Sequence, residues 1–76
     1  MSATATLDAK GLNCPLPVLK AKKAMGGLDA GEILEVMATD PGSVKDFESF
    51  CEATGHELIE SSDADGVYTF MIKKSG

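Results

Sequence analysis

Two prolines one residue apart, Pro15 and Pro17, limit the fold of this chain more than any other feature of its sequence. Proline fixes φ at about −65° and has no backbone N–H, so it suits the first turn of a helix and disrupts the interior of a helix or a central strand. Apolar side chains follow at helical spacing: Val18, Ala21, Ala24, Met25 and Leu28. We therefore predict a helix over about residues 15–26, ended by two glycines.

A second helix is predicted over about residues 43–54, before the glycine at position 55. Ser43 is its candidate N-cap, and Asp46 occupies the capping-box position three residues later. The face of this helix expected in the core carries Val44, Phe47, Phe50, Cys51 and Thr54. This face should pack against a sheet.

Four short segments are predicted to be strands, over about residues 4–9, 32–40, 56–61 and 67–74. Blurred alternation in the second predicts burial on both of its sides, and the stretch DADG before the fourth predicts a hairpin turn. The order βαβαββ predicts an α/β (α+β) two-layer sandwich, in which two helices cover one face of a four-stranded mixed sheet. We expect a single domain over residues 1–76, with a thin core because so short a chain buries only about 60% of its unfolded surface.

Cys14 is the candidate reactive group, because the proline after it disfavours a helical conformation and makes it the expected N-cap of the first helix. Its sulfur would then lie at the positive end of the helix, with the N–H groups of Leu16 and Val18 as donors and lysines nearby. Such a position lowers the pKa of a thiol. We expect Pro15 and Pro17 to stiffen this site rather than to serve packing. The alternative is that Cys14 is a small buried hydrophobe, as most free cysteines are.

The rest of the chain offers little catalytic machinery. Cys51 shares a helix face with Phe47, which predicts core packing rather than a resolving thiol, and His56 suits a turn or surface role better than that of a base for Cys14. Neither cysteine has metal-ligand spacing and no phosphate loop is present, so we expect no metal and no cofactor. One reactive sulfur without a base indicates a carrier better than a self-sufficient catalyst.

The charge and the apolar pattern of the chain limit the classes of partner and the compartment that we expect for it. A net charge of −5 without any arginine argues against direct binding of nucleic acid. No apolar run approaches the roughly 18 residues of a membrane span, and the first dozen residues lack the features of a secretory signal. We therefore expect a cytoplasmic protein that neither spans nor binds a membrane.

The charge is also unevenly divided along the chain. Residues 1–28 hold four lysines against one aspartate, whereas residues 29–76 hold three lysines against eleven acids. In the basic part, helical geometry places Leu16, Lys20 and Lys23 on one outward stripe that begins beside the cysteine. We interpret this stripe as a candidate partner-binding surface, with an ordinary solvated helix face as the alternative.

Two long segments, LDAKGLNCPLPVLKAKKAM and GEILEVMATDPGSVKDFESFCEATGHEL, resemble the TusA (also called SirA) family of small sulfur-carrier proteins over nearly the whole chain. The CPxP motif matches, and further matches in the same order and spacing are Asp8, Gly11, Leu12, Asp40, Pro41, Asp46, Gly55 and His56. The resemblance implies the βαβαββ fold and a persulfide carried on Cys14, with Gly11, Pro15 and Pro17 as supporting residues of the motif.

The same resemblance implies two protein partners. One is a sulfur donor, either a cysteine desulfurase or a rhodanese-like enzyme, and the other is a DsrE-like sulfur acceptor. Members of the family are linked to tRNA thiolation, to sulfur oxidation and to selenium metabolism, and the sequence does not choose among these pathways.

Two other classes of function stay open. A non-catalytic interaction or regulatory module would use the surface around Leu16 and need no reactive sulfur. A thiol–disulfide or peroxide redox protein would need a resolving cysteine near Cys14, and Cys51 is expected to face the core.

Overall fold

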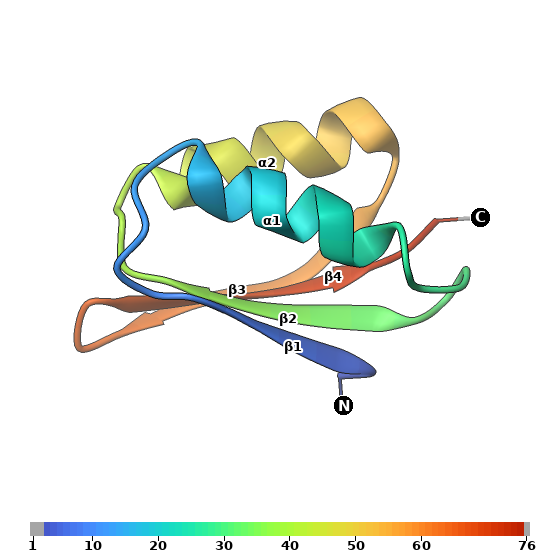
Figure 1. Cartoon of the computed structure of the whole chain (residues 1–76), viewed down its shortest axis with the longest axis horizontal. Coiled ribbons are helices and arrows are strands. Elements are labelled where there is room, and N and C mark those ends of the chain that lie inside the picture. The colour runs from blue at the N-terminus through green and yellow to red at the C-terminus, as the bar shows by residue number, and fades with distance from the viewer. Residues whose placement is uncertain (1–2, 76) are drawn as a thin grey trace.

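The computed structural model of the chain describes residues 3–75. Its elements, in chain order, are β1 (Ala5–Ala9), α1 (Leu16–Met25), β2 (Ile33–Ala38), α2 (Ser43–Thr54), β3 (Glu57–Ala64) and β4 (Val67–Lys73). Both helices lie on one face of a four-stranded sheet, so the described residues form two layers (Figure 1). The predicted order βαβαββ and the two-layer α+β fold are confirmed.

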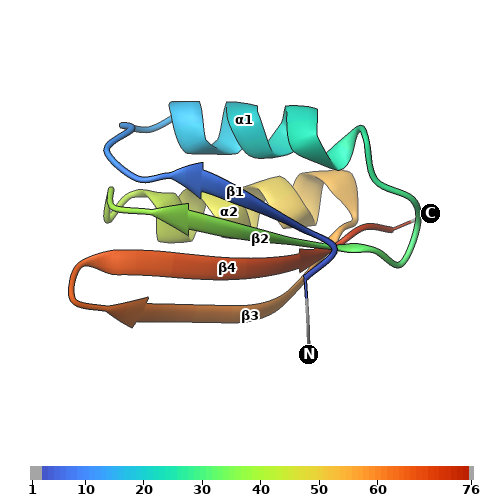
Figure 2. The ribbon, with the colours of Figure 1, turned by 60° about the horizontal axis from the view of Figure 1, so that its bottom comes forward.

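The strands of the sheet lie in the order β1-β2-β4-β3 (Figure 2). β1 and β2 are parallel, whereas β4 pairs antiparallel with both β2 and β3, so the sheet is mixed as predicted. A parallel pair needs a crossover connection, and α1 supplies it. Because of this connection, the C-terminal ends of β1 and β2 lie together, next to the N-terminal ends of both helices (Figures 1 and 2).

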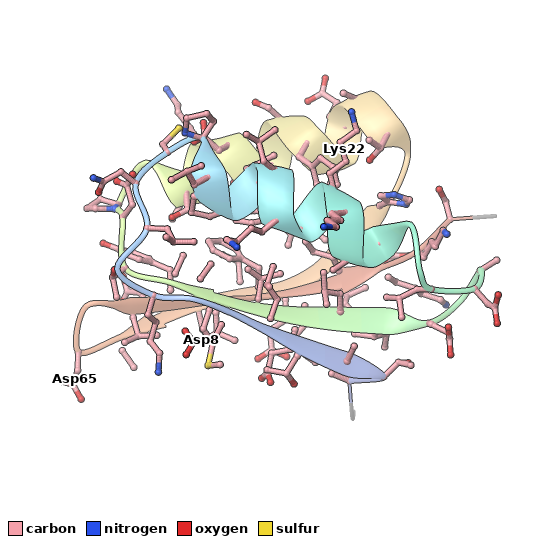
Figure 3. All side chains as sticks on the ribbon, in the orientation of Figure 1. Asp8, Lys22 and Asp65 are labelled. Atoms are coloured by element: carbon pink, nitrogen blue, oxygen red, sulfur yellow. The ribbon has the colours of Figure 1, made fainter. Side chains whose placement is uncertain are left out.

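The hairpin between β3 and β4 turns through Asp65 and Gly66, which both have positive φ, 52° and 80°. Positive φ at both central residues is the pattern of a type I′ turn, for which Asp-Gly is a favoured pair. The hairpin predicted from DADG is therefore confirmed. Figure 3 shows Asp65 at its tip and Asp8 on the face of the sheet that the helices leave uncovered.

β2 is deeply buried on one side only, so the prediction of burial on both sides is wrong. Leu34, Val36 and Ala38 are buried, and the residues between them are only half-buried. The helices cover a single face of the sheet. Ile33 and Met37 put apolar side chains on the other face, and they blur the alternation in the sequence.

Two phenylalanines centre the core between α2 and the sheet. Phe47 and Phe70 are fully buried, and their rings stack with centroids 4.7 Å apart. Phe50 meets Phe47 edge-on at 6.3 Å. These contacts fix α2 on β4 and so fix the position of the first turn of α2.

α1 turns Pro17, Ala21 and Met25 toward the sheet, at a spacing of four residues that places them on one face. The expectation that the prolines serve no packing is wrong for Pro17, because its ring is fully buried in the core. Leu16 is 46% exposed, as expected for the outward stripe. Leu19 is 55% exposed and extends the apolar part of that surface, which the sequence interpretation did not include.

α2 has the predicted span, but its N-cap is Gly42 rather than Ser43. Ser43 is the first helical residue and is buried, and its hydroxyl donates a hydrogen bond to the carbonyl oxygen of Asp40. Among the described residues no side chain caps α2, so Asp46 does not take part in the expected capping box. At the other end, Thr54 is exposed rather than part of the core face.

Candidate functional site

Cys14 lies in the loop between β1 and α1, with an exposed, free thiol. The alternative of a buried cysteine is therefore excluded. The N-cap of α1 is Pro15 rather than Cys14, which places the cysteine one residue outside the expected position. The N–H of Leu16 donates to the carbonyl oxygen of Asn13 at 2.9 Å, so this group is used by the loop and is not directed at the sulfur.

The loop that carries Cys14 is held by residues that follow β2. The N–H of Gly11, which has φ of 81°, donates to Oγ1 of Thr39 at 2.9 Å. The N–H of Cys14 donates to Oδ2 of Asp40 at 2.7 Å, and Oδ1 of Asp40 accepts the N–H of Gly42 at 3.0 Å. These two N–H groups favour the charged carboxylate, so the pKa of Asp40 lies below its ordinary value.

Asp46 brings a second carboxylate to the sulfur from another element. It lies in the first turn of α2, 32 residues after Cys14, and its Oδ2 accepts a hydrogen bond from the thiol of Cys14. The contact exists because α1 and α2 run in the same direction with their N-terminal ends side by side (Figure 1). The site therefore joins a thiol before one helix to a carboxylate in the first turn of the other.

These neighbours raise the pKa of the Cys14 thiol above its ordinary value. The largest cause is the hydrogen bond to Asp46, followed by desolvation and by the negative charges of Asp46 and Asp40. Each of these favours the neutral thiol over the thiolate. The prediction of a lowered pKa is therefore wrong, because the groups nearest the sulfur are carboxylates rather than helix N–H groups or lysines.

Lys20 and Lys23 lie beyond the first turn of α1, six and nine residues after Cys14. Both lysines are exposed, as predicted for the outward stripe. Figure 3 shows Lys22, between them, pointing away from the sheet.

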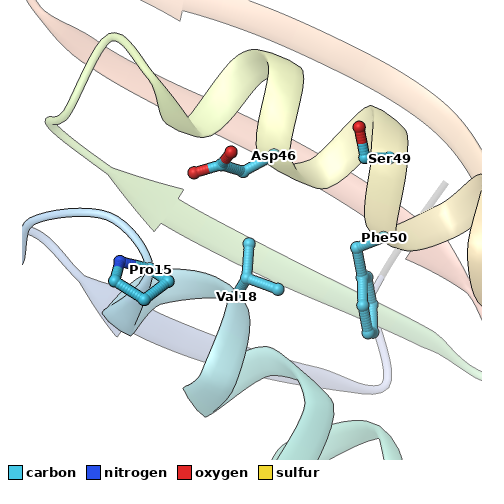
Figure 4. A pocket seen from close by; sticks show the side chains of 5 residues that line it. All are labelled: Pro15, Val18, Asp46, Ser49 and Phe50. Atoms are coloured by element: carbon cyan, nitrogen blue, oxygen red, sulfur yellow. The ribbon is translucent and has the colours of Figure 1, made fainter.

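An open groove lies between α1 and α2, and Pro15, the residue after Cys14, is part of its lining (Figure 4). Its volume is about 280 Å³, and it is lined by Pro15, Val18, Asp46, Ser49 and Phe50. Figure 4 shows the side chains of Val18 and Phe50 facing the space between the helices, with Asp46 at the end near Pro15. The candidate site is thus a sulfur and a carboxylate at the end of a largely apolar groove.

The remaining sulfur and the imidazole lie elsewhere. Cys51 is only 5% exposed, which confirms its predicted place in the core, and burial raises the pKa of its thiol. His56 follows the C-terminal end of α2, where Nδ1 accepts the N–H of Ser75 at 3.1 Å and the ring contacts Phe50. The prediction that His56 does not serve Cys14 as a base agrees with this position.

Within residues 3–75, no group of three or more His, Cys, Asp and Glu side chains could hold a metal ion. Neither helix of this part of the chain has the length and apolar character needed to cross a membrane.

The structure brings together residues that sequence reasoning treated separately. Asp40, noted only as a match to a family pattern, and Asp46, also expected in a capping box, both contact Cys14. Asp46 and Pro15, the neighbour of Cys14 in the chain, line the same groove. The position of Asp40 near Cys14 could have been predicted from the sequence. The C-terminal ends of two parallel strands joined by a helix lie together, and Cys14 and Asp40 follow the two strands. The contact of Asp46 depends on how the two helices are placed, which no local pattern specifies.

A family model described as sulfurtransferase TusA matches residues 5–74 of the chain. A sulfur carrier protein TusA of Allochromatium vinosum is 58% identical over 69 residues, which cover 91% of each chain. A putative sulfur carrier protein of Neisseria meningitidis serogroup B is 52% identical over 68 residues, 90% of this chain and 92% of the other.

The fold also matches a solved structure. A SirA-like protein of Desulfitobacterium hafniense superposes with a TM-score of 0.84 at 32% identity, and the match covers 96% of this chain and 100% of the other. The family model and the relatives agree with the family indicated by the sequence, and the solved structure agrees with the fold described above. The chain therefore belongs to the TusA family of sulfurtransferases.

Proposed function

We propose that this chain is a sulfur carrier that accepts sulfane sulfur as a persulfide on Cys14 and passes it to an acceptor. The observation that carries the proposal is the exposed, free thiol at the start of the CPxP motif, held by a backbone hydrogen bond to Asp40. Relatives over nine-tenths of the chain are named sulfur carrier proteins, which supports the same role.

The chemistry requires the sulfur of Cys14 as a nucleophile, with loss of the thiol proton as it reacts. When the sulfur of Cys14 attacks the terminal sulfur of a donor persulfide, one S–S bond forms and the donor's S–S bond breaks. The donor leaves as a thiolate, and the transferred sulfur keeps its oxidation state, so no oxidant or reductant is consumed. Delivery to an acceptor thiol repeats the exchange with Cys14 as the leaving group.

The supporting residues of the motif would act on the position of the sulfur. Gly11 allows the turn after β1, Pro15 caps α1, and Pro17 anchors the first turn of α1 in the core. Because the loop is bonded to residues after β2, little conformational entropy is lost when a partner engages the thiol.

The surface beside the thiol suits protein partners. Leu16, Lys20 and Lys23 are exposed, and Leu19 extends the apolar part. Exposed leucines next to a reactive group can anchor in a partner's pocket, while lysines steer the encounter. We propose a cysteine desulfurase or rhodanese-like donor and a DsrE-like acceptor, without direct contact to nucleic acid, and a cytoplasmic location in which the free thiol stays reduced.

Intact-mass measurement tests the proposal. After incubation with a cysteine desulfurase and cysteine, or with a rhodanese and thiosulfate, the chain should gain the mass of one sulfur atom. Cys14→Ser should eliminate the gain, and Cys51→Ser, the matched control at the other cysteine, should retain it. Loss of two hydrogen atoms would indicate a redox protein instead, and no change with any donor would favour an interaction module.

A further inference from the structure

Asp46 lies in the first turn of α2, where its negative charge is favourable to the helix dipole, but that role does not require a contact with the thiol of Cys14. It does not cap α2, and among the described residues its hydrogen-bond partner is the thiol of Cys14. Asp46 is half-buried and lies at the end of the groove between the helices, whereas the sulfur it contacts is exposed. A carboxylate that accepts a hydrogen bond from a reactive atom is placed to act on that atom.

The resting state that this contact creates poses a chemical problem. The hydrogen bond and the negative charges of Asp46 and Asp40 favour the protonated thiol. The nucleophile in sulfur exchange is the thiolate, so a proton must leave Sγ before or during the attack. Asp40 is occupied by the backbone N–H groups of Cys14 and Gly42, which leaves Asp46 as the carboxylate in contact with the sulfur.

We propose that Asp46 is a catalytic proton carrier for Cys14: it accepts the thiol proton as the sulfur attacks a donor persulfide, and returns it to the sulfur on delivery. This inference rests on the proposed persulfide function. A carboxylate is a weaker base than a thiolate, so the proton moves as the new S–S bond removes negative charge from Sγ, not before it.

Protons and charges balance over the cycle. In loading, Cys14–SH, the donor persulfide R–S–SH and the Asp46 carboxylate become Cys14–S–SH, the donor thiolate and the protonated Asp46. In delivery, Cys14–S–SH, an acceptor thiolate and the protonated Asp46 become Cys14–SH, the acceptor persulfide and the Asp46 carboxylate. One S–S bond breaks and one forms in each step, and the chain returns to its starting state.

The proposal predicts opposite effects of one substitution on two reactions of the same thiol. Asp46→Asn removes the negative charge and the base while keeping the size of the side chain. The thiolate fraction of Cys14 near neutral pH should rise, so alkylation by iodoacetamide, a small neutral reagent, should become faster. Loading from glutathione persulfide should become about 100-fold slower, the lower end of the range for a lost acid–base group.

Two further variants complete the experiment, with circular dichroism to check that each folds. Glu48→Gln removes an exposed acid from the same helix and should change neither rate. Asp46→Glu keeps a carboxylate and should recover much of the loading rate, which also covers the case in which the Asn variant folds poorly. If Asp46 acted only on stability, Asp46→Asn would not make alkylation faster and loading slower at the same time.

The outcomes also distinguish this inference from the proposed function. If the unsubstituted chain takes up no sulfur from glutathione persulfide or from a cysteine desulfurase, the carrier function fails and the proton carrier fails with it. If the unsubstituted chain loads and Asp46→Asn loads equally fast or faster, the carrier function stands and Asp46 is not its proton acceptor. Faster alkylation together with slower loading supports both.

Discussion

Replacement of Phe47 by leucine tests the packing that holds α2, and with it Asp46, against the sheet. Phe47 is fully buried between Phe70 and Phe50. Truncation of such a residue to alanine costs about 3–5 kcal/mol. That approaches the whole stability of a chain of 76 residues, about 4–11 kcal/mol at roughly 0.05–0.15 kcal/mol per residue. Leucine keeps most of the apolar volume and loses the ring contacts, so we expect a loss of about 1–2 kcal/mol.

Urea unfolding followed by circular dichroism measures this loss, and thermal unfolding should show a Tm lower by about 4–16 °C. Phe50→Leu is the matched control, because Phe50 is 8% exposed and borders the open groove, so its ring is less fully packed. We expect a smaller loss there. A loss below about 0.5 kcal/mol at Phe47, the range of ordinary surface substitutions, or a larger loss at Phe50, would refute this account of the core.

Three further predictions concern the two thiols and the outward stripe. Cys51→Ser should lower the free energy of unfolding by on the order of 1 kcal/mol, while Cys14→Ser leaves it nearly unchanged; equal losses in urea unfolding would contradict the assigned burial. The rate of Cys14 alkylation should rise with pH to a midpoint above that of a free cysteine peptide, and a midpoint below it would show that the carboxylates do not control the thiol. The pKa of the Cys14 thiol is higher in the folded state than in the unfolded state. The contribution of the thiol proton to the free energy of unfolding is therefore fully present below the unfolded-state pKa and is lost as pH rises through the folded-state pKa. Lys20→Glu with Lys23→Glu should slow persulfide transfer between proteins at about 20 mM salt, where the Debye length is roughly 20 Å, without changing alkylation; unchanged transfer would mean a plain solvated face.

The fold could be predicted from the sequence because its elements are specified locally. The proline pair begins α1, Gly55 follows the end of α2, and Asp65-Gly66 encodes its own turn. The burial of Pro17 was also accessible, since Pro17, Ala21 and Met25 are spaced four apart and share a helix face. Pro17 therefore has two roles, because it stiffens the first turn of α1 and also packs in the core.

The electrostatics of the site could not be predicted in the same way. The sequence shows lysines after Cys14 and a helix start beside it, and both suggest a lowered pKa. The controlling groups are instead Asp40 and Asp46, 26 and 32 residues away along the chain. Asp40 reaches the backbone N–H of Cys14 because β1 pairs in parallel with β2, and Asp46 reaches its sulfur because the two helices start side by side. Both are tertiary features.

Transfer of labelled sulfur through the chain tests the central claim most directly. A cysteine desulfurase given cysteine with radiolabelled sulfur loads the chain, the desulfurase is removed, and reduced glutathione is added as the acceptor thiol. The account predicts label on the peptide that contains Cys14, followed by its loss from that peptide as glutathione gains an equal amount, and no labelling of the Cys14→Ser chain. Label on Cys51, label that stays on Cys14 when glutathione is added, or equal labelling of the Cys14→Ser chain would contradict a carrier function at Cys14.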